Sequence, residues 1–274
     1  MSLAKNFDIK DKVVAITGGG GVLCAAMALA LGEQGAKIVL LDIGEDGLKR
    51  VGDELSAKGI ESIGVKCNVL DKSSIQAAAD KAIETFGHVD ILINGAGGNK
   101  PQATTGPDKS FFDLPEDAVN WVLNLNFMGT FLPCQVFGKH FADRGEGNII
   151  NISSMNAFTP LTKIAAYSAA KAAVSNFTQW LAVHMSQNYS TKIRVNAIAP
   201  GFLLTNQNRF LLTDEKDGSL TARGKTIIDH TPMAKFGEPE DLISTIQWLV
   251  APSSAFVHGI IVPVDGGFSS FSGV

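Results

Sequence analysis

Tyr167 and Lys171 stand four residues apart in an alanine-rich segment, and together they could exchange a proton with a substrate. On a helix this spacing places both side chains on one face. A phenol has a pKa of about 10, and a neighbouring ammonium favours the phenolate, so we expect Lys171 to lower the pKa of Tyr167. Ser154, upstream of this pair, could donate a hydrogen bond to the same reacting oxygen. These residue types predict a site that interconverts a carbonyl and an alcohol.

A Tyr-x-x-x-Lys pair alone is a common accident of helix surfaces, so its interpretation depends on the elements around it. One of these is an apolar, β-branched run at 12–17, followed by four glycines at 18–21 and an Ala/Leu-rich segment to residue 32. A strand, a glycine turn and a helix form a dinucleotide-binding unit, in which backbone approaches a pyrophosphate at the helix N-terminus. We expect this contact at Gly18, Gly21, Val22 and Leu23.

The second predicted strand, KIVLLD, ends at Asp42. A carboxylate at this distance from the glycine turn can accept hydrogen bonds from both hydroxyls of an adenosine ribose, and it repels a 2′-phosphate. The next residue, Ile43, offers no positive charge for such a phosphate. The sequence therefore predicts NAD as the cofactor, in preference to NADP.

Strands and helices alternate along the rest of the chain. We expect strands at 63–69, 90–94, 148–153, 193–199 and 259–267, and helices at 44–58, 73–86 with Ser73 as its cap, 115–141, 167–186 and 238–250, with a loop at 99–117. This alternation predicts an α/β fold of one domain over 1–274, with a doubly wound, seven-stranded parallel sheet. The irregular segment 206–235 is interpreted as a substrate loop or lid.

Small and polar residues stand at several predicted strand ends, where open parallel sheets bind ligands. Asn68 and Val69 end the third strand, and the small residues Ala96 and Gly97 follow the fourth, where they would let a flat group lie against the backbone. Asn126 falls inside a predicted helix, which is unfavourable unless its amide has a polar role. A solvated Asn is the alternative at that position.

Composition excludes several classes of protein. The 274 residues are 45% hydrophobic and 18% charged, which indicates a folded globular chain, and a net charge of −4 supplies no basic surface for nucleic acid or anionic lipid. The three cysteines lack metal-ligand spacing, so no metal is expected and the thiols are interpreted as free in a reducing compartment. The uncharged run at 13–32 is interpreted as the strand and helix above and not as a membrane span. A soluble, cytoplasmic protein is the expectation.

From about residue 12 to 267 the sequence resembles the short-chain dehydrogenase/reductase family. The resemblance rests on the Thr17-Gly18 turn, Asp42, the NGAG run at 94–97, Asn126 in NFMGTF, Ser154 in ISS, the YSAAK run at 167–171, and Pro200-Gly201 with Thr205. It implies a catalytic tetrad of Asn126, Ser154, Tyr167 and Lys171, in which Lys171 also binds the nicotinamide ribose and Asn126 holds a water. It further implies cofactor contacts at Asn94, Pro200, Gly201 and Thr205.

The glycine turn departs from the family pattern Thr-Gly-x-x-x-Gly-x-Gly. An ungapped comparison places Val22 and Cys24 at the second and third glycines, while Gly20 and Gly21 lie just before. Either the turn is shifted locally or the pyrophosphate is held differently.

A narrower resemblance, in INGAGGNKPQATT and GGGGVLC, is to the D-mannonate oxidoreductase (fructuronate reductase) branch of the family. It implies reduction of D-fructuronate with NADH, with a gluconate 5-dehydrogenase-like, polyol or 3-oxoacyl ketoreductase as the alternative and a non-catalytic NAD sensor as a lesser one. Residues expected at the substrate are Asn99, Lys100, Ser154, Asn156 and Arg209. Lys100 could pair with a carboxylate, or it could be a solvated loop charge. Family likeness also implies a homotetramer formed through the two long helices and the last strand.

Overall fold

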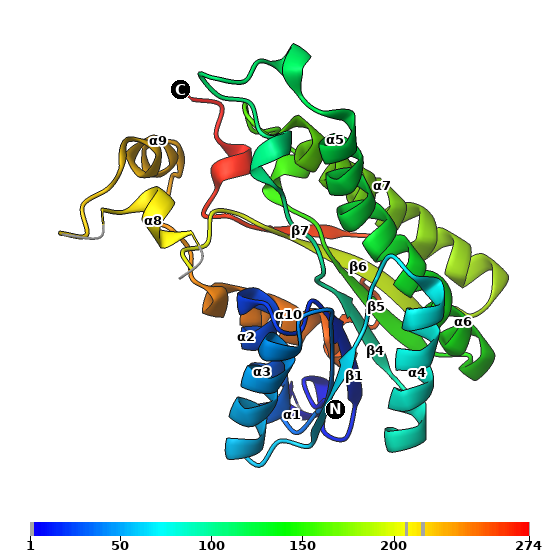
Figure 1. Ribbon diagram of the computed structural model, residues 1–274. Coiled ribbons are helices and arrows are strands. Elements are labelled where there is room, and N and C mark those ends of the chain that lie inside the picture. The colour runs from blue at the N-terminus through cyan, green and yellow to red at the C-terminus, as the bar shows by residue number, and fades with distance from the viewer. Residues whose placement is uncertain (1–2, 206–207, 215–216, 274) are drawn as a thin grey trace.

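A computed structural model describes residues 3–205, 208–214 and 217–273. Seven parallel strands form one sheet in the order β3-β2-β1-β4-β5-β6-β7 (Figure 1). The strands are β1 Val13–Thr17, β2 Lys37–Asp42, β3 Ser62–Lys66, β4 Ile91–Asn94, β5 Gly147–Ile152, β6 Ile193–Pro200 and β7 Ile261–Val264. In the register Val14 lies beside both Ile38 and Ile91. The predicted doubly wound, seven-stranded parallel sheet is confirmed.

Two layers of helices cover the two faces of the sheet (Figure 1). One layer contains α2 Val22–Glu33, α3 Glu45–Ala57 and α10 Ile243–Val250, and the other contains α4 Lys72–Phe86, α6 Gly129–Arg144 and α7 Ala165–Asn188. The inner strands β1, β4 and β5 are almost wholly buried because both of their faces are covered, which is why they read as continuous apolar runs.

Shorter elements connect this frame. They are α1 Leu3–Asn6, α5 Glu116–Leu123, α8 Arg209–Leu212 and α9 Ala222–His230, the 3-10 turns η1 Pro101–Ala103, η2 Phe111–Asp113, η4 Met155–Ala157, η5 Pro239–Leu242, η6 Pro252–Ser254 and η7 Phe268–Ser270, and the π-helical turn η3 Asn124–Met128. The segment expected to be irregular at 206–235 thus holds two helices in its described part. Residues 206, 207, 215 and 216 of that segment lie outside the described residues.

Several predicted boundaries are wrong. The last strand, predicted at 259–267, is Ile261–Val264, and the last helix, predicted at 238–250, begins at Ile243 after a 3-10 turn. The cap of α4 is Asp71 and not Ser73, because the Asp71 carboxylate accepts from the Ser73 amide at 2.9 Å. The single helix expected over 115–141 is α5, η3 and α6, since the chain takes a π-helical turn around Asn126. The third strand ends at Lys66, so Asn68 and Val69 lie in the loop that follows it.

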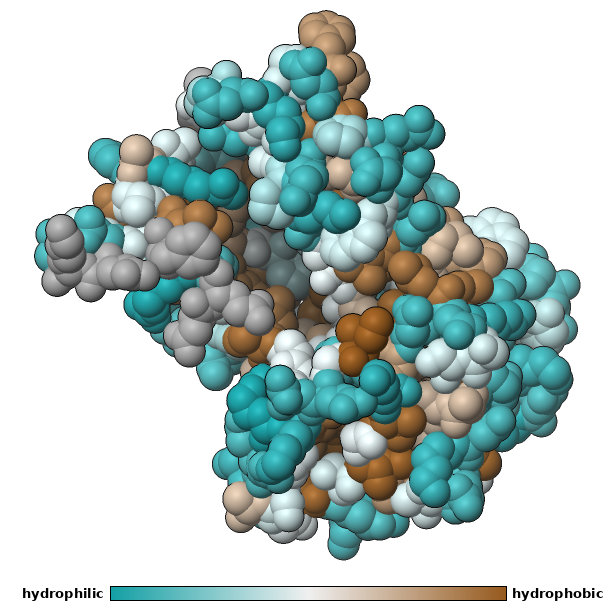
Figure 2. Space-filling view, viewed as in Figure 1, coloured by the Kyte–Doolittle hydropathy of each residue, from teal (hydrophilic) through white to brown (hydrophobic). Residues whose placement is uncertain are grey.

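The order of the strands reverses between β1 and β4, whose carboxyl ends therefore border a crevice. Figure 2 shows the molecule hollowed beside these ends, between the part that carries α8 and α9 and the part that carries α5. Within the described residues, the helices are all too short or too polar to cross a membrane.

Candidate active site

Ser154, Tyr167 and Lys171 come together where β5 ends and α7 begins. The Lys171 side chain is buried, and its Nζ donates a hydrogen bond to the carbonyl of Ile152 at 2.8 Å. Ser153 ties the two elements together, since its Oγ donates to the carbonyl of Lys171 at 3.1 Å and contacts the Ser175 hydroxyl at 2.7 Å. The positioning role of Ser153 was not predicted, because it depends on a contact between distant segments.

Burial controls the proton affinities in this cluster. It raises the pKa of Tyr167, although the hydrogen bond with Ser154 opposes this shift. It lowers the pKa of Lys171 to about 8, because the charged ammonium is removed from water. The expected lowering of the Tyr167 pKa by Lys171 is therefore wrong for this structure. The reason is geometric: the ammonium is bound to the Ile152 carbonyl and lies 5.6 Å from the centre of the Tyr167 ring.

Asn126 is fully buried in the π-helical turn η3. Its Nδ2 donates to the carbonyls of Gly98 at 2.7 Å and Val122 at 2.8 Å, and its Oδ1 accepts from the Gly98 amide at 3.1 Å. The π-helical turn widens the backbone so that the amide faces the loop after β4, as such turns often do at functional sites. A solvated Asn126 is excluded.

At Gly97 the loop after β4 lies close to both Asn126 and Lys171. A Cβ added there would lie 2.7 Å from Asn126 Oδ1 and 3.3 Å from Lys171 Nζ. This crowding leaves no space for a side chain at position 97. Ala96 is held in place because its amide donates to Thr17 Oγ1 at 3.2 Å.

The glycine turn between β1 and α2 is closed by backbone hydrogen bonds. Gly18 has a φ of +69°, a conformation that favours glycine, and its carbonyl accepts from the Gly21 amide at 2.9 Å. Gly21 is the N-cap of α2 and provides no side-chain cap for the helix. The first-turn amides, including those of Val22 and Leu23, have no acceptor within the helix, and this arrangement suits an anion such as a pyrophosphate.

Cys24, at the position of the third family glycine, is buried beneath the loop after β4. Its Sγ donates to the Thr17 carbonyl at 3.6 Å and fills the space that a Cβ on Gly95 would occupy. The departure from the family turn is thus accommodated by a glycine on the neighbouring strand. Burial raises the pKa of this thiol to about 12, so it stays protonated.

Asp42 makes contacts that the sequence did not reveal. Its Oδ2 accepts from the Gly20 amide and its Oδ1 from the Gly44 amide, both at 2.9 Å. Arg50 approaches the same turn, where its Nη2 donates to the Gly20 carbonyl at 2.8 Å and its Nη1 pairs with Glu54. The carboxylate is thereby held at the end of β2, with acceptor capacity remaining on both oxygens.

The other residues predicted to bind the cofactor lie near strand ends, but their side chains make different contacts. Asn94 faces the second helical layer, because its Nδ2 donates to Asn151 at 2.9 Å and Cys134 at 3.1 Å, so only its backbone borders the crevice. The exposed Asn68 caps its own loop by accepting from the Leu70 amide, and Val69 is buried. Pro200 ends β6 and Gly201 follows it, with the Gly201 amide donating to the Val264 carbonyl. The Thr205 amide donates to Asn208.

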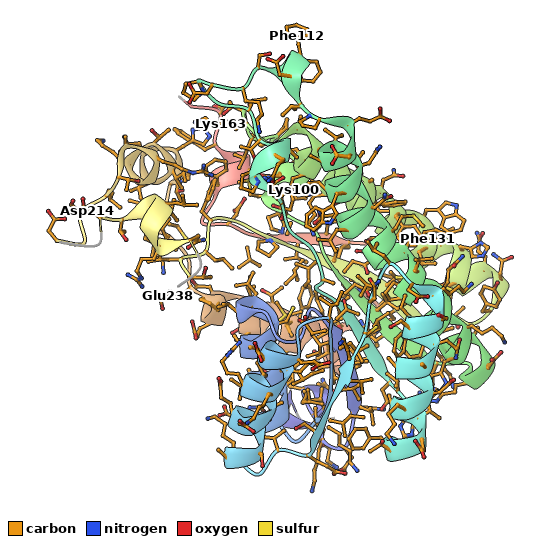
Figure 3. The ribbon with its side chains drawn as sticks, viewed as in Figure 1. Lys100, Phe112, Phe131, Lys163, Asp214 and Glu238 are labelled. Carbon is orange, nitrogen blue, oxygen red and sulfur yellow. The ribbon has the colours of Figure 1, made fainter. Side chains whose placement is uncertain are left out.

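The residues predicted to bind the substrate lie in different environments, some exposed and some buried. Lys100 lies with its ammonium 4.6 Å from the centre of the Trp121 ring on α5, a cation–π contact (Figure 3). Asn99 donates to Thr104 within its own loop, and Arg209 is exposed on α8. Asn156 is buried in η4, two residues after Ser154, and its amide N–H donates to Ser154 Oγ at 3.3 Å.

Three comparisons relate the chain to known proteins. The sequence model of the short chain dehydrogenase family matches residues 12–216. An oxidoreductase of uncharacterised activity from Haemophilus influenzae is 48% identical, over 100% of this chain and 99% of its own length. The 2-dehydro-3-deoxy-D-gluconate 5-dehydrogenase of Escherichia coli is 33% identical, over 96% of this chain and 97% of its own. A solved Haemophilus structure with bound NAD, described as a candidate D-mannonate oxidoreductase, superposes with a TM-score of 0.92 at 48% identity and covers 100% of both chains.

Proposed function

Because the chain belongs to the short-chain dehydrogenase family, we propose that it is an NAD-dependent enzyme that interconverts a ketone and a secondary alcohol on a sugar acid. The first substrate that we propose is D-fructuronate, reduced with NADH to D-mannonate, or the reverse reaction. The observation that carries the proposal is the cluster of Ser154, Tyr167 and buried Lys171 at the carboxyl end of β5. The Haemophilus structure, described as a candidate D-mannonate oxidoreductase, supports the choice of substrate.

In the proposed reduction, Tyr167 gives its phenolic proton to the substrate oxygen. Burial raises the pKa of Tyr167, so the phenol is protonated at neutral pH, as a proton donor must be. Ser154 stabilises the same oxygen by a hydrogen bond as negative charge develops there.

The residues that border the crevice fit a nicotinamide dinucleotide, which when bound would supply the hydride. The uncapped first turn of α2 would hold the pyrophosphate. Asp42 would accept from the adenosine ribose hydroxyls with its remaining lone pairs, so we propose NAD over NADP. Lys171 would hold the nicotinamide ribose, with Pro200, Gly201 and Thr205 at the nicotinamide end.

A second substrate class is favoured by the relative from Escherichia coli, which is a 5-dehydrogenase of a deoxy keto acid. Gluconate-type keto acids would use the same proton donor and the same cofactor, and only the groups that contact the rest of the substrate would differ. A sensor that binds NAD without catalysis is disfavoured, because all four tetrad residues are present at the crevice.

The test is NADH consumption at 340 nm by the purified protein with D-fructuronate, 5-ketogluconate, tagaturonate and an acetoacetyl thioester, each repeated with NADPH. We expect fast turnover of D-fructuronate with NADH and little with NADPH. Turnover of another keto acid would retain the chemistry and replace the substrate. NADH binding without turnover of any compound would contradict the proposed enzyme.

We also propose that the protein assembles as a homotetramer. An aromatic surface, made of Phe127, Phe131, Phe177, Trp180, His184 and Tyr189, runs over η3, α6 and α7 with successive ring centres 4.7 to 6.0 Å apart except for Phe177 and Trp180, which are 6.2 Å apart. Trp180 and Tyr189, at one end of this surface, are both more than half exposed, and aromatic side chains are enriched at protein–protein interfaces. Cys24, Cys67 and Cys134 are free and buried, which supports the proposal of a reducing, cytoplasmic location.

A further inference from the structure

We propose that the segment joining Ser154 to Tyr167 recognises the sugar acid, with the Lys163 ammonium pairing with its carboxylate and the Asn156 amide binding one of its hydroxyls. This inference rests on the proposed function, since it assumes an anionic, polyhydroxylated substrate. A sugar acid needs a positive charge at some distance from the reacting ketone, because the carboxylate lies at the far end of its carbon chain. The tetrad itself provides no such group beyond Lys171, which is bound to the Ile152 carbonyl.

The lysines of the neighbouring loop are already engaged. The Lys100 ammonium lies over the Trp121 ring at 4.6 Å. The Lys109 ammonium lies 3.5 and 3.4 Å from the carbonyl oxygens of Pro101 and Gln102. Lys163 is exposed, and its side chain makes no ion pair or hydrogen bond to any part of the chain that the structure describes. Its positive charge is therefore available to a ligand.

The backbone of Lys163 is nevertheless held in place. Its carbonyl accepts from the Thr105 amide at 3.0 Å and from Thr105 Oγ1 at 3.4 Å, which joins this segment to the loop after β4. Four residues later the chain reaches Tyr167 in the first turn of α7. Because the backbone at its base is already fixed, binding a carboxylate would require ordering only the side chain.

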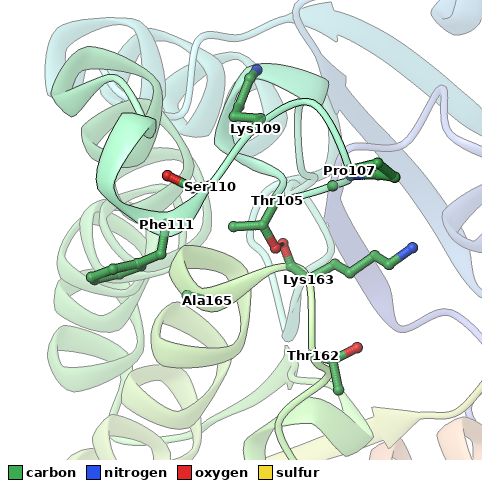
Figure 4. Close-up of a pocket in the computed structure, with 9 residues that line it drawn as sticks. Thr105, Pro107, Lys109, Ser110, Phe111, Thr162, Lys163 and Ala165 are labelled. Carbon is green, nitrogen blue, oxygen red and sulfur yellow. Dashed lines mark hydrogen bonds between the residues drawn. The ribbon is translucent and has the colours of Figure 1, made fainter.

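Lys163 also lines a cavity of about 560 Å³ between the loop at 105–111 and the start of α7. Thr162, Thr105 and Ser110 add hydroxyl groups to its wall, which suit a polar ligand. In Figure 4 the Lys163 side chain extends away from α7 and from Lys109. Figure 3 shows Lys163 on the rim above the hollow that lies beside the strand ends. The tetrad residues do not line this cavity. We therefore place there the end of the substrate that does not react.

Asn156 provides the second and independent observation. The residue is 4% exposed, and its Oδ1 is buried without a hydrogen-bond partner among the described residues. A buried polar atom without a partner destabilises the fold, because it has lost its hydrogen bonds to water and gained none in return. The turn that carries Asn156, η4, packs between α7 and the C-terminal turn η7, directly after Ser154. A substrate hydroxyl at this place would satisfy the amide.

The experiment compares wild type with Lys163→Met, using the keto acid that wild type reduces fastest and the uncharged carboxamide of the same acid. We expect Lys163→Met to raise KM for the acid about tenfold, to leave kcat within about twofold, and to leave the carboxamide unaffected. Lys163→Arg should retain most of the affinity because it keeps the charge. Asn156→Ala should raise KM for the acid and the carboxamide alike.

Lys109→Met is the matched control, since Lys109 lines the same cavity and is engaged with backbone carbonyls. It should leave KM for the acid unchanged. If wild type reduces keto acids and Lys163→Met has the same KM as wild type, this inference is overturned and the proposed function is not. This inference is also overturned if Arg209→Met, and not Lys163→Met, raises KM for the acid while leaving the carboxamide unaffected. A wild type that binds NADH but reduces no keto acid overturns the proposed function and this inference together.

Discussion

At the scale of the residue, the site depends on two side chains whose charges are controlled by burial. Tyr167 has a raised pKa and Lys171 a lowered one, so each is shifted toward its neutral form. Both shifts follow from the loss of solvent around a charge. The phenol is therefore protonated when the protein is at neutral pH, while Lys171 can still carry its proton there.

Replacing Tyr167 by Phe removes the proposed proton donor and little else. We expect kcat to fall at least about a hundredfold, the size of a general-acid contribution, while NADH affinity stays nearly unchanged. Steady-state kinetics and a fluorescence titration with NADH measure the two quantities. Tyr189→Phe is the control, because Tyr189 is the chain's second tyrosine and is exposed on the aromatic surface. If Tyr167→Phe retained most of its activity, the mechanism would be wrong.

Lys171 makes stability depend on pH. Its pKa falls from 10.5 to about 8 on folding, so between these values the unfolded chain binds more protons than the folded chain, and stability rises with pH. We expect wild type to gain up to about 3 kcal/mol relative to Lys171→Met as pH rises from about 8 to 10.5. Urea unfolding of both proteins at each pH measures this difference in stability.

Lys192→Met is the control for this measurement, since the Lys192 side chain is exposed. Its stability relative to wild type should not vary with pH over the same window. A difference between wild type and Lys171→Met that is independent of pH would show that the ammonium is not buried.

At the scale of the element, the glycine turn of β1 and α2 and the loop after β4 form one packed unit. Cys24 fills the space beside Gly95, where a Cβ would collide with its sulfur and lie 2.9 Å from the Thr17 carbonyl. We expect Gly95→Ala to destabilise the fold by about 1–3 kcal/mol. Adding Cys24→Ala should recover part of that loss, because it removes the sulfur.

The control for Gly95→Ala is Gly52→Ala in α3, where an added Cβ meets nothing within 4 Å. It should be neutral or stabilise the fold by up to about 1 kcal/mol through helix propensity. Thermal unfolding of the single and double variants measures these changes. Equal losses from Gly95→Ala with and without Cys24→Ala would contradict the packing between them.

At the scale of the whole molecule, the proposed assembly rests on the exposed end of the aromatic surface, at Trp180 and Tyr189. Four chains of 29.0 kDa correspond to a particle of about 116 kDa, which light scattering after gel filtration can measure. We expect Trp180→Asp to lower the mass, because it places a charge in the proposed interface. Phe112→Asp should leave the mass unchanged, since Phe112 is 91% exposed but lies at the tip of the loop after β4 (Figure 3). A monomeric wild type would end the tetramer proposal.

The sequence alone determined the fold class and the placement of Tyr167 and Lys171 on one helix face, because both follow from local pattern. Apolar runs alternating with helical segments predict the doubly wound sheet, and the i, i+4 spacing places Tyr167 and Lys171 on one face of α7. The strand ends at Asp42 and Pro200 were predictable for the same reason.

The tertiary structure alone decided where the polar side chains point. Lys171 donates to Ile152 across the β5–α7 junction, Asn94 faces the helical layer, and Lys100 lies over Trp121. The π-helical turn around Asn126 likewise follows from its bonds to Gly98, which stands far away in the chain. Each of these arrangements is a contact between segments that are distant in sequence, and no local periodicity encodes such a contact. The burial that shifts the pKa values of Tyr167 and Lys171 arises in the same way.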